Sequence, residues 1–158
     1  MVLCPYIANL LKKSGISFRW ILIGSGEEEP KVKNAIEQLD LQNDVIMVGK
    51  KSNPYPYIVR ADIMVHPSLV ESQGITLLES MVLKTPVIAV ASKGPQEFIN
   101  TGENGYLVDN NAEEIAHTIE MLYTNTSLRK LIADNAAKDV RRFGCEEIMK
   151  KINNILGG

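Results

Sequence analysis

Short apolar runs alternate with segments of helical periodicity along this sequence, and this alternation constrains the fold more than any other feature. The apolar runs are bounded by turn residues and are typical of strands. Strands and helices in alternation indicate a parallel sheet with helices on both faces. The sequence therefore predicts a Rossmann-like α/β domain that ends in C-terminal helices. Expected strands cover residues 18–23, 45–48, 62–66, 86–90 and 106–108. Expected helices cover residues 6–13, 30–39, 55–60, 74–83, 112–122, 128–140 and 146–155.

Length and composition fit a single domain over residues 1–158, with 45% hydrophobic residues and a net charge of −2. A near-neutral chain without a basic stripe argues against nucleic acid as a partner. No apolar run approaches the roughly 20 residues of a membrane-spanning helix, and the N-terminus lacks a signal-peptide pattern, so we expect a cytoplasmic protein. Cys4 and Cys145 lack disulfide or metal-ligand spacing, and neither His66 nor His117 completes a metal-ligand pattern. No metal site is predicted.

Two carboxylates eight positions apart, Glu71 and Glu79, flank a glycine at the expected start of a helix. The first N–H groups of a helix lack internal partners, so Gly74, Ile75 and Thr76 can present donors to a phosphate or a sugar hydroxyl. Gly74 would let the ligand come close. Because helical side chains lean toward the N-terminus, the Glu79 carboxylate is expected to point back at the same place. A structural alternative stays open, since Thr76 and Glu79 also match a capping box.

A second glycine turn follows the first expected strand, at Gly24 and Gly26. A dinucleotide fingerprint would require a third glycine where this chain has Glu29, and glutamates at positions 27–29 would repel a pyrophosphate. These glutamates are better explained as complements to the dipole of the following helix. Open α/β sheets nevertheless bind ligands at the carboxyl ends of their strands. Gly24 and Gly26 therefore remain candidates for the ligand site.

Three further motifs follow in order at residues 85–89 (TPVIA), 94–99 (GPQEFI) and 102–108 (GENGYLV). Together with Glu71 and Glu79, they closely resemble the C-terminal half of retaining glycosyltransferases of family 4, from about residue 21 to about residue 143. The resemblance implies the C-terminal half of a GT-B fold. It also implies a nucleotide-diphosphate sugar, UDP-, GDP- or ADP-linked, as donor substrate, and chemistry that needs neither a metal nor another cofactor.

The resemblance assigns roles to individual residues. Glu79 would hold the ribose hydroxyls and Glu71 would contact the donor sugar as the catalytic candidate. Lys51 lies on a loop that passes near the nucleobase in the family, although lysines there are more often a solvated surface. The backbone donors at the helix start, and the loop that lines the donor cleft, complete the binding set: Ser72, Gln73, Gly74, Ile75, Thr76, Gly24 and Gly26. Two departures are Ser72-Gln73 where Gly-Phe is frequent, and Lys84 where glycine usually precedes Thr-Pro.

A larger departure concerns the start of the chain. Family members carry an arginine and a lysine after the first strand of this domain, and these neutralise the departing diphosphate. The match places Met1 inside the helix after that pair, so we expect a donor-binding domain truncated at its N-terminus and inactive alone. We also expect the N-terminal domain that holds the acceptor in the family to lie outside this chain. The resemblance also admits polysaccharide biosynthesis and peripheral membrane association for the full-length enzyme.

Two other classes remain open. One is a non-catalytic nucleotide-binding or interaction module, which an α/β chain of this length could be. The other is a fragment of a GT-B sugar-nucleotide epimerase. The pair Glu71 and Glu79 argues against the epimerase, because its hydrolytic chemistry would need further acids in the site.

Overall fold

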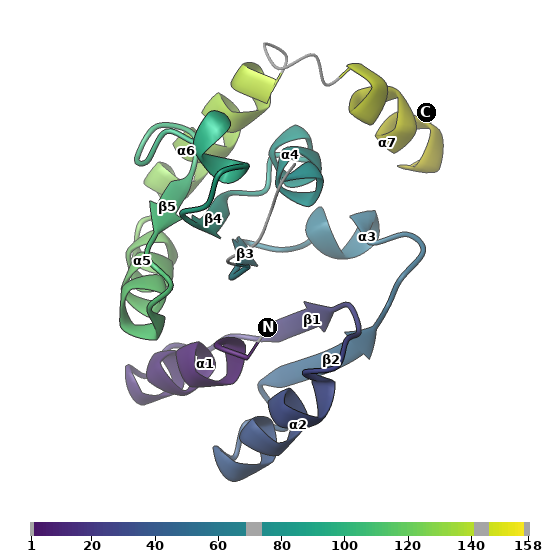
Figure 1. Ribbon diagram of the computed structural model, residues 1–158. Coiled ribbons are helices and arrows are strands. Elements are labelled where there is room, and N and C mark those ends of the chain that lie inside the picture. Colours follow the sequence, from purple (N-terminus) through teal and green to yellow (C-terminus); the bar gives the residue numbers. More distant parts are fainter. Residues whose placement is uncertain (1, 69–73, 141–145, 157–158) are drawn as a thin grey trace.

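The computed structural model describes residues 2–68, 74–140 and 146–156, and it confirms the expected α/β fold (Figure 1). The strands are β1 (Trp20–Ile23), β2 (Val45–Gly49), β3 (Met64–His66), β4 (Val87–Val90) and β5 (Tyr106–Val108). The helices are α1 (Cys4–Lys13), α2 (Glu29–Gln38), α3 (Tyr55–Ile58), α4 (Ile75–Val82), α5 (Ala112–Thr124), α6 (Thr126–Asp139) and α7 (Glu146–Leu156). A 3-10 turn, η1, covers Pro95–Glu97. Every expected strand and helix occurs in the expected order, with ends displaced by a few residues.

The strands form the middle of three layers, with α1 and α2 on one side and α4 and α6 on the other (Figure 1). Successive side chains of a strand point to opposite faces, so β4 contributes to two cores. Ile88 and Val90 pack with residues of α1 and α5. Val87 and Ala89 pack with residues of α4 and α6. All four side chains of β4 are buried, as expected for a strand with a neighbour on each edge and helices on each face.

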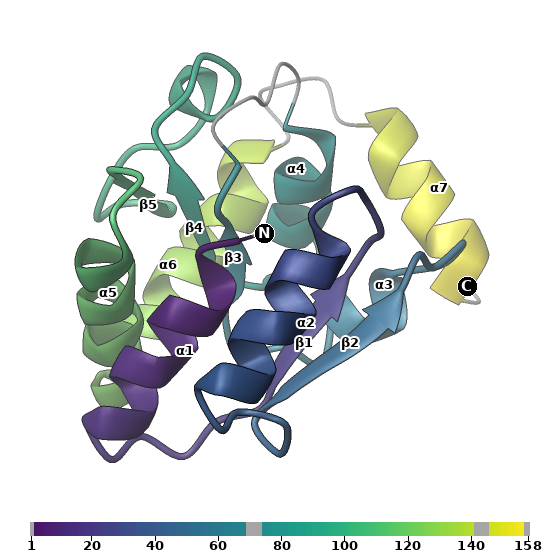
Figure 2. The same ribbon diagram turned by 60° about the horizontal axis from the view of Figure 1, so that its bottom comes forward.

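Helix α1 packs both on β1 and on β4, and it lies in front of the strands in Figure 2. Its residues Ile7 and Leu11 belong to the core of β4 and α5. Cys4 and Ala8 instead pack with Leu22 of β1 in the core shared with α2. Burial raises the pKa of the Cys4 thiol to about 11, so this group stays protonated near neutral pH and acts as a small apolar side chain.

The sheet is interrupted, which the alternation of strands and helices did not predict. All pairs are parallel, but β1 pairs with β2, and β3 pairs with β4, with no pairing between β1 and β3 among the described residues. The N–H of Trp20 donates to the C=O of Asp44 at 2.7 Å, and the N–H of Met64 donates to the C=O of Pro86 at 2.8 Å. Sequence periodicity locates strands but does not say which of them are neighbours, so the break could not be predicted.

β1 and β3 therefore each have one edge without a paired strand among the described residues, and we call the position between these two edges the slot. Main-chain groups of alternate residues point to opposite edges of a parallel strand. Ile21, Ile23 and Val65 therefore direct their N–H and C=O groups into the slot, because their neighbours pair on the other edge. The order β2-β1 followed by β3-β4-β5 matches the doubly wound order 3-2-1-4-5-6 with its first strand absent from the described residues.

The turn after α4 gives a first testable prediction. Lys84 has a φ of +59°, a left-handed conformation that favours glycine at the end of a helix. Relative to Lys84→Ala, Lys84→Gly should raise the free energy of unfolding by about 0.5–1 kcal/mol, as measured by urea denaturation. The change also removes an exposed ion pair, 2.9 Å from Lys84 Nζ to Asp134 Oδ1, worth about 0–1 kcal/mol. Lys84→Ala loses the same ion pair and keeps the left-handed backbone, so it is the matched control and should show no gain.

Candidate functional site

The predicted binding residues that the structure describes follow the carboxyl ends of three strands. Gly24 and Gly26 follow β1, Lys51 follows β2, and Gly74 opens the helix that comes after β3. The carboxyl edge is the side on which open parallel sheets bind ligands. Sequence reasoning therefore selected residues from separate parts of the chain that the topology brings to one edge. Three predicted residues lie outside the described residues, and their roles stay predictions: Glu71, Ser72 and Gln73.

Gly74 is the residue from which α4 begins. Its φ is +63°, and a Cβ atom at this position would lie 2.6 Å from Cζ of Phe98. Both observations require glycine, so packing against Phe98 is a structural reason for this residue beside the predicted close approach of a ligand. Among the described residues no side chain caps α4. The N–H groups of Ile75 and Thr76 therefore point out of the helix end without a helical acceptor, as the sequence predicted.

Glu79 is a buried carboxylate, 7% exposed, and its Oε1 accepts a hydrogen bond of 2.7 Å from the hydroxyl of Tyr55. The capping-box interpretation is wrong, because the N-cap of α4 is Gly74 and Thr76 already lies inside the helix. The left-handed glycine starts the helix two residues earlier than a threonine cap would. Tyr55 was missed by sequence reasoning, since a side-chain pair between two different helices leaves no periodic signal.

Helix α3, which carries Tyr55, is tied to its surroundings at both ends. The N–H of Tyr55 donates to Asn53 Oδ1 at 3.1 Å, and the Thr85 hydroxyl donates to the C=O of Ile58 at 2.8 Å. Tyr55 and Ile58 are also packed with Ile152 of α7. Thr85 comes from the motif at residues 85–89, so one function of that motif is to hold α3 against the end of α4.

The motif at residues 102–108 supports the same region through Asn104, which is 1% exposed. Its side-chain amide donates to the C=O of Phe98 at 3.0 Å and to Asp139 Oδ2 at 3.1 Å, and its Oδ1 accepts from the N–H of Asn100 at 2.7 Å. Phe98 is the residue whose ring lies against Gly74. Asn104 therefore stabilises the packing that fixes the start of α4.

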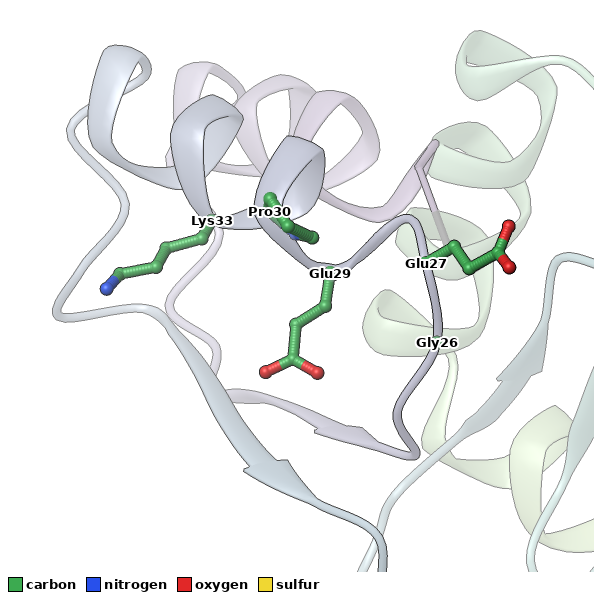
Figure 3. Close-up of a pocket in the computed structure, with 5 residues that line it drawn as sticks. All are labelled: Gly26, Glu27, Glu29, Pro30 and Lys33. Atoms are coloured by element: carbon green, nitrogen blue, oxygen red, sulfur yellow. The ribbon is translucent and has the colours of Figure 1, made fainter.

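The glycine turn after β1 borders a hollow of about 430 Å³, lined by Gly26, Glu27, Glu29, Pro30 and Lys33 (Figure 3). In Figure 3 the carboxylates of Glu27 and Glu29 lie on different sides of the turn, and Lys33 extends away from both. Glu29 is the first residue of α2, as the helix-dipole interpretation requires. Two carboxylates beside Gly26 make this hollow unsuited to a pyrophosphate, which agrees with the missing dinucleotide fingerprint.

The remaining candidate residues are one lysine and two histidines, and their positions in the fold do not by themselves indicate a catalytic role. Lys51 is exposed on the segment that joins β2 to α3, and His117 is exposed on α5 as expected. His66 is half-buried at the end of β3. Within residues 2–68, 74–140 and 146–156, no group of three or more His, Cys, Asp and Glu side chains could hold a metal ion. None of the described helices is long and apolar enough to cross a membrane.

Comparison with known proteins gives a consistent set of relatives. A sequence model of the family described as Glycosyl transferases group 1 matches residues 3–139. The lipopolysaccharide core biosynthesis glycosyltransferase LpsE of Rhizobium meliloti is 35% identical over 133 residues, which are 83% of this chain and 39% of LpsE. The poly(ribitol-phosphate) alpha-N-acetylglucosaminyltransferase of Staphylococcus aureus is 29% identical over 94% of this chain and 31% of its own length. The chain thus spans about a third of the length of these relatives.

Solved structures give the same result for the fold, which is that of GT-B glycosyltransferases. The S. aureus protein TarM superposes with a TM-score of 0.85 at 28% identity, over 99% of this chain and 32% of TarM. Anabaena HepE, crystallised with UDP-glucose, superposes with a TM-score of 0.80 at 26% identity, over 96% of this chain and 44% of HepE. A crystallised C-terminal domain of the group 1 protein LpcC from Francisella tularensis superposes with a TM-score of 0.78 at 30% identity, over 89% of this chain and 77% of that domain.

Proposed function

This chain belongs to the glycosyl transferases group 1 family, and from that premise we propose that it is the domain of a longer, cytoplasmic transferase that binds a nucleotide-diphosphate sugar. The observation that carries the proposal is Glu79, a buried carboxylate that accepts a hydrogen bond from Tyr55 and lies on α4, the helix that begins after the left-handed Gly74. A carboxylate accepts hydrogen bonds from a ribose diol, and helix-start N–H groups bind phosphate oxygens. Both groups lie on the ligand-binding edge of the sheet.

The proposed roles follow from this arrangement. Glu79 binds the ribose, and the N–H groups of Ile75 and Thr76 stabilise phosphate and sugar oxygens as charge develops on the leaving group. Glu71 contacts the donor sugar, and transfer retains the anomeric configuration. The donor is a UDP-, GDP- or ADP-sugar, and no metal or other cofactor takes part. UDP-glucose is bound by HepE, which supports the uridine donor as the first to test.

The slot between β1 and β3 supports the proposal that this domain is completed by an N-terminal part of the longer protein. A strand in the slot would pair with Ile21 and Ile23 on one edge and with Val65 on the other. Because α1 packs on both strand groups, a strand that leads into α1 would form a right-handed crossover to β1. The N-terminal part would also hold the acceptor and exclude water from the reacting centre.

Residues 1–158 alone should therefore transfer no sugar from any donor, whereas a chain extended upstream through an N-terminal domain should be active. Hydrogen exchange gives a second measurement, since the extension should slow exchange of the Ile21, Ile23 and Val65 amides while Trp20 and Met64 change little. Sugar transfer by purified residues 1–158 would contradict the proposal that this chain binds the donor and needs an N-terminal part for transfer.

Nucleotide binding is the direct test of the proposed function. Thermal-shift and titration experiments with UDP-, GDP- and ADP-sugars should give base-selective binding with a dissociation constant on the order of 0.1–1 mM, about 4–5.5 kcal/mol. The affinity is low because the part of the cleft outside this chain is absent from the experiment. If none of these nucleotides changed the melting temperature at millimolar concentration, the chain would be better explained as an interaction module.

Glu79→Gln separates ligand binding from structural support. Glutamine can still accept the hydrogen bond from Tyr55, but it replaces one acceptor with an amide that cannot accept from ribose. We expect a melting temperature within about 2 °C of the parent and roughly a tenfold loss of nucleotide affinity. A large loss of stability with unchanged affinity would make Glu79 a structural residue.

A further inference from the structure

We infer that Tyr55 is a positioning residue for Glu79, and that it links the C-terminal helix α7 to the ribose-binding carboxylate. The inference deepens the proposed function and rests on it. Tyr55 was not among the predicted binding residues, and it lies on α3, a helix that carries none of them.

The contact itself is short and shielded from water. The hydroxyl of Tyr55 lies 2.7 Å from Oε1 of Glu79, and the two residues are 2% and 7% exposed. Hydrogen bonds to an ionised acceptor are shorter and stronger than neutral ones, and low exposure strengthens them further. A glutamate side chain has three rotatable bonds, so an unrestrained carboxylate would lose conformational entropy on binding a diol. Tyr55 removes part of that cost by fixing the carboxylate beforehand.

Tyr55 can fix another side chain because its own position is fixed. Its N–H is bound to Asn53 Oδ1, and the C=O of Ile58 in the same helix accepts from the Thr85 hydroxyl. The tyrosine also belongs to a small core with Ile58 and Ile152. Tyrosine has only two side-chain torsions before its hydroxyl, so an anchored ring places the oxygen accurately.

Ile152 connects this arrangement to α7. Figure 1 shows α7 beside α3 and α4, and the small core contains Ile152 of α7 together with Tyr55 of α3. Val82 and Leu83, at the end of the helix that carries Glu79, pack against the same core. The packing of α7 thereby supports the Tyr55 ring, and through it the position of the Glu79 carboxylate.

A purely structural role is the competing explanation, because a buried tyrosine hydroxyl needs an acceptor in any case. The two explanations differ in what they predict for the ligand. A structural defect weakens the whole site and lowers affinity for every nucleotide equally. A positioning defect lowers only the affinity that comes from the ribose hydroxyls, which are the groups that Glu79 would bind.

The test compares Tyr55→Phe with the parent, using UDP, GDP or ADP, whichever binds, and the 2′,3′-dideoxy form of the same diphosphate. Calorimetric titration should show about a fivefold to tenfold loss of affinity for the ribose nucleotide and less than about twofold for the dideoxy form. Tyr57→Phe is the matched control, since Tyr57 lies on the same helix, is 36% exposed and should change neither affinity.

Equal losses for both ligands, or no loss for either, would overturn the inference while leaving the proposed function intact. A parent chain that binds none of the diphosphates would instead overturn the proposed function. Should Tyr55→Phe fail to fold, Ile152→Ala provides the second variant. It removes packing against the Tyr55 ring but keeps the tyrosine hydroxyl itself. Ile152→Ala should also lose more affinity for the ribose nucleotide than for the dideoxy form. Equal losses of affinity for both nucleotides would again reject the link between α7 and Glu79.

Discussion

Gly74→Ala should lower the free energy of unfolding by about 3 kcal/mol, which would be one of the largest effects of any single substitution at the site. A left-handed backbone costs a non-glycine residue about 1–2 kcal/mol. The new methyl group would also lie 2.6 Å and 2.8 Å from two atoms of the Phe98 ring, which is itself buried. Overpacking of this kind costs about 1–3 kcal/mol. Since the ring cannot move freely, we expect the start of α4 to shift.

Thermal denaturation would measure this as a fall in melting temperature of about 6–12 °C, at roughly 2–4 °C per kcal/mol for a chain of this size. Gly26→Ala is the matched control. Nothing lies within 4 Å of the Cβ position at Gly26, and its φ is not in the left-handed region. Equal stability of the two variants would mean that Phe98 does not constrain Gly74.

Asn104→Leu should have a similar effect by a different cause. Leucine has nearly the same shape as asparagine but forms none of the three hydrogen bonds that Asn104 makes with Phe98, Asn100 and Asp139. At about 1 kcal/mol for each, and more for a group left buried without a partner, we expect a loss of about 3 kcal/mol. Because the loop that carries Phe98 would loosen, nucleotide affinity should fall as well.

Urea denaturation, with nucleotide titration under the same conditions, would measure both effects. The control is Asn135→Leu, which removes one solvent-exposed hydrogen bond of 3.0 Å, to the C=O of Glu103. That variant should lie within about 0.5 kcal/mol of the parent. If Asn104→Leu were as stable as the control, the buried amide would not organise the loop.

The order and type of the secondary-structure elements were predictable because each has a strong local signal. Strands such as β4 are short apolar runs between turn residues, and helices such as α5 have clear caps and apolar spacing. The ligand-binding edge also followed from the sequence, since glycines after β1 and before α4 had to lie at the carboxyl ends of parallel strands.

What could not be predicted depends on contacts between distant residues. The spacing of Thr76 and Glu79 matches a cap, and only the left-handed Gly74 and the hydroxyl of Tyr55 decide against it. The reason for glycine at position 74 includes the ring of Phe98, which is distant in sequence. The slot between β1 and β3 depends on which strands are neighbours, and sequence periodicity does not predict strand order. Local patterns therefore gave the elements and the edge, whereas tertiary packing determined how the site is held.

Helix α1 has a consequence for synthesis of the chain on the ribosome. Cys4 and Ala8 can pack with β1 and α2 soon after those elements emerge, because their partners are close in sequence. The core of Ile7 and Leu11 is completed only by β4 and α5, which follow about 80–110 residues later. At about 5–20 residues per second this delay lasts roughly 4–22 s. Throughout that interval a nascent chain carries a helix whose apolar face is only partly covered, which is the kind of surface that chaperones bind.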